Sequence, residues 1–216
     1  MGKEFVISDV ETGKLNALVK NLMSQMAITD SNETVRRINS GEWVVSQIAN
    51  KWREQDGVIY FSVTSDGTTG EEWNTRLESK GFRLSDYTKS VLRSKDFKPT
   101  SGVTTEIAVL KGLLFTDSGR ITENVRAEAT KRKLTKPNAE VACLIREKFT
   151  DKEIEATGLW WIVTMHEPIK DSGSGPSLLG TGRLDDGRWL RAYYGYLDYR
   201  WNRERGFAFA VSQVSA

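Results

Sequence analysis

The run LWWIVTM, residues 159–165, is the feature that most narrows the folds open to this chain. It contains only uncharged residues, most of them aromatic, β-branched or leucine, which is typical of a buried strand. Gly158 precedes the run, and the His-Glu-Pro sequence at 166–168 ends it, because proline lacks the N–H that a central strand donates. We therefore expect a sheet in which this strand lies at the centre.

Several further segments have the composition or the alternation of strands. Residues 58–63 (VIYFSV) are mostly β-branched or aromatic, and residues 103–110 alternate between their two faces. Two final strands are expected at about 188–196 and 206–214, and the second places its two phenylalanines on one face.

Capping residues mark the starts of the expected helices. Thr69 with Glu72, and Thr150 with Glu153, have the spacing of a capping box, in which each side chain accepts a hydrogen bond from the other residue's backbone N–H. Ser85 is expected to cap a third helix. These three positions predict where the chain turns from loop into helix.

Other helices are expected on weaker signals. One spans about 122–133, and another follows Thr135, which we interpret as an N-cap with Pro137 early in the helix. The first forty residues predict two helices from their apolar spacing, followed by a short strand at 43–45.

The glycine-containing loop at 65–70 lies between an expected strand and an expected helix, an arrangement that can bind phosphate. It matches neither GxxxxGK[ST] nor GxGxxG. Glu71 and Glu72 in the first turn would repel an anion. The sequence therefore favours a plain capped turn here.

The overall composition is that of a globular protein. The chain has 216 residues, 38% hydrophobic and 28% charged, with a net charge of +2, which argues against a protein that binds nucleic acid mainly by neutralising phosphate. No apolar run approaches the roughly 18 residues that span a bilayer, so we expect no membrane insertion. The N-terminal residues lack a signal-peptide pattern, so we expect a cytoplasmic protein and leave display at the surface by another route open.

No group of residues indicates catalysis or metal binding. His166 is the only histidine, which excludes HExxH and His-rich sites, and GxSxG is absent. Cys143, the only cysteine, is expected in the core. Asp185 and Asp186 lack EF-hand spacing. We therefore expect a protein that is not an enzyme and has no cofactor.

The stretch WLRAYYGYLDYRWNRERGF, residues 189–207, has a different character from the rest. It holds two of the seven Trp and four of the six Tyr, mixed with Arg, Asn, Asp and Glu. A hydrophobic core uses aliphatic residues instead, because buried hydroxyls and guanidinium groups need partners. Tyrosine, tryptophan and arginine together are typical of a contact surface. An edge hairpin with a packed aromatic face is the alternative.

The C-terminal residues resemble the diversified segment of variable proteins made by diversity-generating retroelements. The residues that carry this match are Gly187, Arg188, Trp189, Leu190, Ala192, Trp201, Arg203 and the sequence GFAFAVSQV at 206–214. The positions between them carry residues that adenine changes in asparagine-type codons produce. A second match, Arg132 to Glu140 together with Ala142 and Cys143, resembles the Leu-Pro-Thr-x-x-Glu helix start in C-type-lectin-like domains related to formylglycine-generating enzymes. It departs from that pattern by the inserted Lys136 and by Val141, where tryptophan is usual.

The resemblance implies an α+β protein, a single compact chain whose residues 101–216 form a C-type-lectin-like domain. Residues 1–100 would form a mixed α/β part of unidentified role, and the variable segment would span about 177–207. The implied function is ligand binding without catalysis or required calcium. The implied partner is a protein or a cell-surface ligand, and the sequence gives neither its identity nor the oligomeric state.

We expect this segment to supply the ligand-binding residues and the aromatic scaffold beneath them. The expected ligand-binding residues are Thr181, Arg183, Leu184, Arg191, Tyr193, Tyr194, Tyr196, Asp198, Tyr199, Arg200, Asn202, Glu204 and Arg205. The expected scaffold residues are Trp189, Trp201, Phe207 and Phe209. Two alternatives remain: a small hydrolase or transferase with a cleft of Tyr, Arg and carboxylates, aided by His166, and a module that binds single-stranded nucleic acid.

Overall fold

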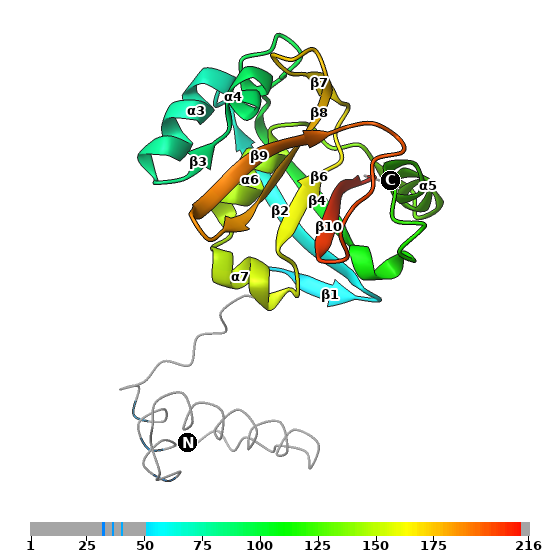
Figure 1. Ribbon diagram of the computed structural model, residues 1–216. Helices are drawn as coiled ribbons and strands as arrows, with labels where there is room; N and C mark the ends of the chain where they lie inside the picture. The colour runs from blue at the N-terminus through cyan, green and yellow to red at the C-terminus, as the bar shows by residue number, and fades with distance from the viewer. Residues whose placement is uncertain (1–31, 33–35, 37–39, 41–50, 213–216) are drawn as a thin grey trace. The chain divides into compact units, whose positions relative to one another are not determined.

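The computed structural model describes residues 51–212 together with Asn32, Arg36 and Ser40 (Figure 1). Its contacts divide the chain into Met1–Asn50 and a compact unit, Lys51–Ala216. Asn32 and Arg36 are helical, and the rest of the two helices expected before residue 41, like the strand expected at 43–45, lies outside the described residues.

Within residues 51–212, ten strands form one mixed sheet in the order β1-β2-β4-β10-β6-β8-β9-β3, with β5 paired to β10 and β7 paired to β8 (Figure 1). Two of these pairings, β10 with β6 and β3 with β9, are parallel, and the others are antiparallel. The strands are β1 (Arg53–Gln55), β2 (Val58–Asp66), β3 (Arg83–Leu84), β4 (Ser101–Lys111), β5 (Leu134–Thr135), β6 (Trp161–Thr164), β7 (Ile169–Lys170), β8 (Pro176–Leu184), β9 (Gly187–Tyr194) and β10 (Arg205–Val211).

Five α-helices and one short 3-10 helix accompany the sheet in this part of the chain. They are α3 (Gly70–Ser79), α4 (Asp86–Leu92), η1 (Gly112–Leu114), α5 (Thr122–Lys131), α6 (Val141–Lys148) and α7 (Asp151–Ala156). The protein is therefore a mixed α/β chain. Both expected capping boxes are present, at the starts of α3 and α7, and Ser85 caps α4.

The expected central strand is confirmed. The four residues of β6 are all buried, and β6 lies between β10 and β8. The strand is shorter than the apolar run, since it begins only at Trp161, and Trp160 just before it is 68% exposed.

One expectation about the central part of the chain is corrected, and one strand was not expected at all. Thr135 does not cap a helix: it pairs with Ala210 in the sheet, and α6 begins only at Val141. The segment at 176–184 forms the long strand β8, which the sequence analysis did not identify, because its glycine and serine residues hide the alternation.

The division expected at residue 100 also differs from the structure. Residues Val58 to Asp66 pair with Ser101 to Leu110 across that boundary, so β2 and β4 belong to one sheet. The boundary that separates compact units falls after Asn50. Local sequence patterns carry no information about this long-range pairing.

The two faces of the sheet bury different sets of side chains. On one face, the apolar residues of α3, α4 and α6 pack on alternate residues of the strands, for example Ile162 and Leu179. On the other face, Val163 and Leu178 pack with residues of α5 and with Trp201. The side chains that β9 places on this face, those of Trp189, Arg191 and Tyr193, are only half-buried.

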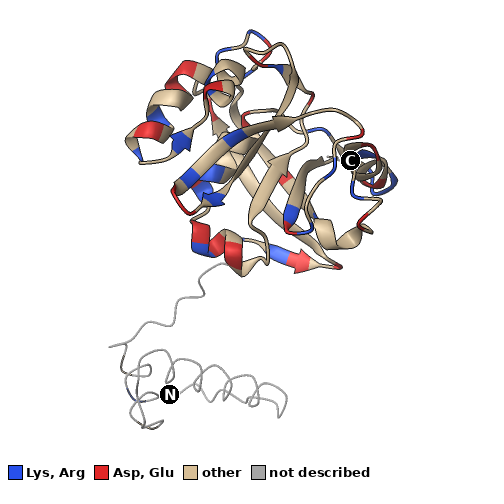
Figure 2. Cartoon of the chain, viewed as in Figure 1, with Lys and Arg blue, Asp and Glu red and all other residues tan. Residues whose placement is uncertain are grey.

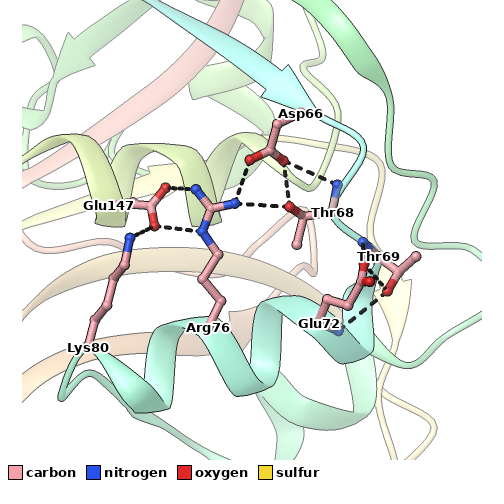
Figure 3. A network of polar contacts seen from close by, with 7 residues as sticks. All are labelled: Asp66, Thr68, Thr69, Glu72, Arg76, Lys80 and Glu147. Carbon is pink, nitrogen blue, oxygen red and sulfur yellow. Dashed lines mark hydrogen bonds and ion pairs between the residues drawn. The ribbon is translucent and has the colours of Figure 1, made fainter.

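A polar network joins α3 to α6 and to the end of β2 (Figure 3). The Arg76 guanidinium donates to both carboxylate oxygens of Glu147, with Nε 2.7 Å from Oε1, and to Asp66 at 2.5 Å. Lys80 also binds Glu147. The Arg76 hydrogen bond first, and then the Thr68 hydroxyl, hold the pKa of Asp66 at about 2, below its ordinary value of 3.8. Arg76 therefore links three separate elements.

We predict that Arg76→Ala lowers the free energy of unfolding by about 1–2 kcal/mol, because charge-assisted bidentate pairs in a network contribute more than isolated ones. The matched control is Arg93→Ala, which removes a fully exposed pair with Glu71 that solvent screens, and it should have a clearly smaller effect. Urea denaturation of both variants measures the difference. Equal losses would contradict a special role for the network.

Candidate functional site

Two adjoining clefts, each of about 490 Å³, open beside β8 and β9. The first, here called the aromatic cleft, has the aromatic lining Tyr87, Trp161, Tyr193, Tyr194, Tyr196 and Tyr199. The second, here called the acidic cleft, is lined by the indole of Trp160 and by the carboxylates of Asp151, Glu155, Asp185 and Glu204, among others. Trp161, Leu184 and Arg205 line both, so the two clefts form one continuous surface.

The alternation of β9 determines which of its side chains reach the second face of the sheet. Leu190 belongs to the core on the first face, so Trp189, Arg191 and Tyr193 project from the opposite face. Tyr193 is paired with Leu178 of β8, and its ring packs partly in the second core. Arg191 and Tyr193 thus enter the aromatic cleft from a rigid strand.

The segment at 195–204, which connects β9 to β10, is fastened to the start of α5 by backbone hydrogen bonds. Thr122 N–H donates to the Tyr199 carbonyl (3.1 Å), and Trp201 N–H donates to the Arg120 carbonyl (2.9 Å). The buried Arg120 guanidinium donates to the carbonyls of Gly112 and Phe115 at 2.9 and 3.1 Å. The backbone of this connection is therefore held in place by hydrogen bonds to residues at the start of α5 and just before it.

The tyrosines of this connection stand on a buried tryptophan. Trp201 is 5% exposed, and its Nε1 donates to the Thr122 hydroxyl at 3.0 Å. Its ring lies edge-on to Tyr199 (4.6 Å between centroids) and to Tyr193 (5.9 Å). Tyr199 in turn contacts Tyr194 at 5.7 Å. Aromatic contacts of this kind hold the exposed rings in defined positions.

Arg205 forms the boundary between the clefts. Its guanidinium carbon lies 5.2 Å from the Trp161 ring centre and 5.0 Å from that of Tyr193, and Nη1 donates to the Tyr193 hydroxyl at 3.0 Å. Burial raises the pKa of Tyr193, and the positive charge of Arg205 opposes that shift. The pair therefore places a neutral phenol against a charged guanidinium.

The turn between β7 and β8 closes the other end of the aromatic cleft. The Asp171 carboxylate accepts hydrogen bonds from the N–H of Gly173 (2.8 Å) and of Gly175 (3.3 Å), and from the Ser177 hydroxyl (2.7 Å). The carboxylate thus organises the turn that lines the cleft.

The structure brings most of the expected ligand-binding residues together. Exposed residues are Arg183, Leu184, Tyr194, Tyr196, Asp198, Arg200, Asn202 and Glu204. Half-buried residues are Arg191, Tyr193, Tyr199 and Arg205. Of these twelve, all except Asp198 and Arg200 line one cleft or both.

Thr181 is the expected contact residue that the structure places elsewhere. Its exposure is 0%, and the alternation of β8 puts it on the same face as Leu179, in the core beside α6. A ligand in the clefts cannot reach it. Among the expected scaffold residues, Trp201, Phe207 and Phe209 are buried, whereas Trp189 is only half-buried and donates to Asp186 at 2.9 Å.

Three aromatic residues that line the clefts were not predicted from the sequence, because they lie outside the C-terminal segment. Tyr87, from α4, is 55% exposed, and Trp160 and Trp161 flank the start of β6. A signal for the tryptophans was available in the sequence. Adjacent residues of a strand point to opposite faces, so two bulky indoles in succession cannot both enter one core.

His166 is placed as a structural residue. It is 1% exposed, its Nδ1 lies 2.7 Å from the Glu167 carbonyl, and its Nε2 accepts from Leu179 N–H at 3.0 Å. Burial lowers the pKa of the ring to about 4. Both ring nitrogens are therefore occupied, and the ring is neutral at pH 7, which leaves no free nitrogen for the hydrolase or transferase alternative.

Three further features of the described part of the chain bear on its function. Burial strongly raises the pKa of the Cys143 thiol, which keeps it protonated. No cluster of three or more metal-ligating side chains occurs among the described residues. The helices described are all too short or too polar to cross a membrane.

Comparisons with protein-family models, with curated proteins and with solved structures find no match to this chain.

Proposed function

We propose that this chain is a ligand-binding protein whose binding surface is formed by the aromatic and acidic clefts. The observation that carries the proposal is the distribution of exposed apolar side chains. Of the nine large hydrophobic residues exposed in the described part of the chain, five line the clefts: Tyr87, Trp160, Leu184, Tyr194 and Tyr196. A sixth, Leu197, follows Tyr196 in the chain. Gathered exposed apolar area of this kind marks interaction sites.

The arrangement of the tyrosines supports binding rather than packing alone. Tyr194 and Tyr196 are 59% and 50% exposed, yet Tyr194 is held by contact with Tyr199. Rigid, exposed aromatic rings give large contact areas at a low entropic cost on binding. Exposed Asn202 and Glu204 add hydrogen-bonding groups at the rim of the acidic cleft.

We further propose that this surface is the display face of a retroelement-diversified protein with a C-type-lectin-like domain. This proposal rests on the sequence resemblance and on the position of residues 177–207. Ten of the expected contact positions in that segment line the two clefts, while Trp201 and Phe207 are buried beneath them. Such a division allows side chains to vary without loss of the core.

The DNA beside the gene tests the proposal of diversification. We expect a near-copy of the codons for residues 177–214 that differs only at adenines, next to a reverse transcriptase gene. The adenine positions should fall on the residues that line the clefts and should avoid Thr181, Trp201 and Phe207. The proposal of diversification fails if both the copy and the reverse transcriptase gene are absent.

Two tyrosines whose rings are in contact test whether the exposed ring belongs to the packed core. Tyr194→Ala should change the free energy of unfolding by less than about 0.5 kcal/mol, because the ring is exposed. Tyr199→Ala should cost about 1–2 kcal/mol, because it removes a half-buried ring from Trp201. Thermal or urea unfolding measures both. Equal destabilisation by the two variants would indicate that Tyr194 is part of the core.

A further inference from the structure

We infer that the aromatic cleft binds an acidic segment of a protein partner, with an Asp or Glu carboxylate held by Arg191 and Arg205. This inference rests on the proposed function and specifies the chemistry of its ligand. It is carried by the charges that line the two clefts and by the partners that those charges have in the folded chain.

Arg191 is a half-buried arginine without a carboxylate partner. Within residues 51–212, the contact found for its guanidinium is with the ring of Trp189, at 5.7 Å. Exposed arginines elsewhere in this part of the chain are commonly paired, as Arg93 is with Glu71 and Arg183 with Glu155. An arginine held among aromatic rings keeps its donors available for a ligand.

Arg205 likewise has only neutral partners among the described residues. The single hydrogen bond found there for its guanidinium is to the Tyr193 hydroxyl, and the guanidinium lies near two aromatic rings. Asp171 is the carboxylate that lines the aromatic cleft, and its oxygens are occupied by the turn and by Ser177. Two arginines and one aspartate give the described lining a net charge of 2 − 1 = +1.

The neighbouring acidic cleft has the opposite character. Glu155 is paired with Arg183, and Asp151 with the buried Arg146. Asp185 and Glu204 make no ion pair with the described residues. Figure 2 shows the same contrast between the acidic helix α7 and the basic strand β9. An anionic group would be repelled from the acidic cleft and directed toward Arg191.

A protein segment fits this surface better than a small anion. Six of the fourteen residues that line the aromatic cleft are tyrosine or tryptophan, whose rings favour apolar groups on the ligand, and the surface continues through Leu184 into a second cleft. A carboxylate beside apolar side chains satisfies both the rings and the guanidinium groups. Arginine gives carboxylates a planar, bidentate partner, and Arg with Tyr and Trp is the composition of binding hot spots.

The test is selection of a random, phage-displayed peptide library on the full chain, followed by affinity measurements with the peptides obtained. We expect Asp or Glu next to an apolar residue to be enriched among the selected peptides. Arg191→Gln should weaken a selected peptide by about tenfold and abolish the acidic enrichment in a repeated selection. Arg93→Gln, whose arginine is paired with Glu71 and lines neither cleft, is the matched control and should change the affinity less than about twofold.

The outcomes separate this inference from the proposed function. Peptides that bind in a Tyr194-dependent way but show no acidic enrichment, or that bind Arg191→Gln as tightly as the parent chain, would overturn the inference and leave the binding function intact. Failure to obtain any peptide whose binding depends on Tyr194 would overturn both. Equal losses from Arg191→Gln and Arg93→Gln would indicate a general charge effect and also overturn the inference.

Discussion

Trp201→Ala is expected to lower the free energy of unfolding by about 3–5 kcal/mol, the range for truncating a buried aromatic residue. Trp201 is 5% exposed and packs against Tyr193, Tyr199 and Phe207. Its removal would leave a cavity between α5 and the sheet and would deprive the buried Thr122 hydroxyl of its indole donor. Urea denaturation, monitored by circular dichroism, measures the loss.

The matched control is Trp160→Ala, since Trp160 is 68% exposed and should contribute less than about 0.5 kcal/mol to folding. Trp189→Ala should fall between the two, because Trp189 is half-buried. A small effect at Trp201, or a large one at Trp160, would contradict the packing described for the second face of the sheet.

Trp201 also links stability to binding. The backbone of the 195–204 connection is fastened at Tyr199, whose carbonyl accepts from Thr122 N–H at the start of α5, and at Trp201, whose N–H donates to the Arg120 carbonyl just before that helix. The Trp201 ring supports Tyr199, which in turn contacts Tyr194. We therefore expect a folded Trp201 variant to lose affinity as well, because the rings at the surface would no longer be held in place.

The local parts of this fold could be predicted from the sequence. The Thr69 and Thr150 capping boxes and the Ser85 cap form as expected, because each depends on residues three positions apart. The buried strand β6 was evident for a similar reason, since an uninterrupted apolar run has few places other than the interior.

The long-range parts could not be predicted in the same way. The pairing of β2 with β4, which places residues 58–66 in the same sheet as the C-terminal segment, leaves no local pattern. Thr135 has the composition of a cap but lies beside β10, where its backbone pairs with Ala210. Tertiary pairing overrides such local preferences.

The sequence predicted which segment supplies the candidate site better than it predicted which face of the sheet each side chain takes. The C-terminal segment does supply most of the lining of both clefts, but the sequence could not show that Thr181 faces the core. It also could not show that Tyr87 and Trp160 join the surface from other elements. Which face a strand residue takes depends on the register of its neighbours, and that register is fixed by the whole sheet.

Acidification is expected to destabilise the protein through His166, by about 3 kcal/mol between pH 7 and pH 4. Burial lowers the pKa of this ring to about 4, whereas the ordinary value is 6.5. Below pH 6.5 the unfolded chain binds a proton that the folded chain does not bind until about pH 4. The free energy of unfolding therefore falls as the pH drops through this window, by about 1.4 kcal/mol for each unit of pKa difference.

The measurement is urea denaturation of the parent chain and of His166→Gln at a series of pH values. Carboxylates with lowered pKa, such as Asp66, affect both proteins alike at still lower pH, so the difference between the two curves isolates the histidine. Parallel curves between pH 7 and pH 4 would contradict the assignment.

Because His166 is the chain's only histidine, the NMR signal of its imidazole Hε1 proton can be assigned without ambiguity and followed directly in the folded protein. A signal that stays constant from pH 7 to pH 5 would agree with a ring whose Nδ1 donates to the Glu167 carbonyl and whose Nε2 accepts from Leu179 N–H, since neither nitrogen can take up a proton without breaking that arrangement. A signal that titrates near pH 6.5 would instead mean that water reaches the ring, and the hydrolase or transferase alternative would regain its acid–base residue.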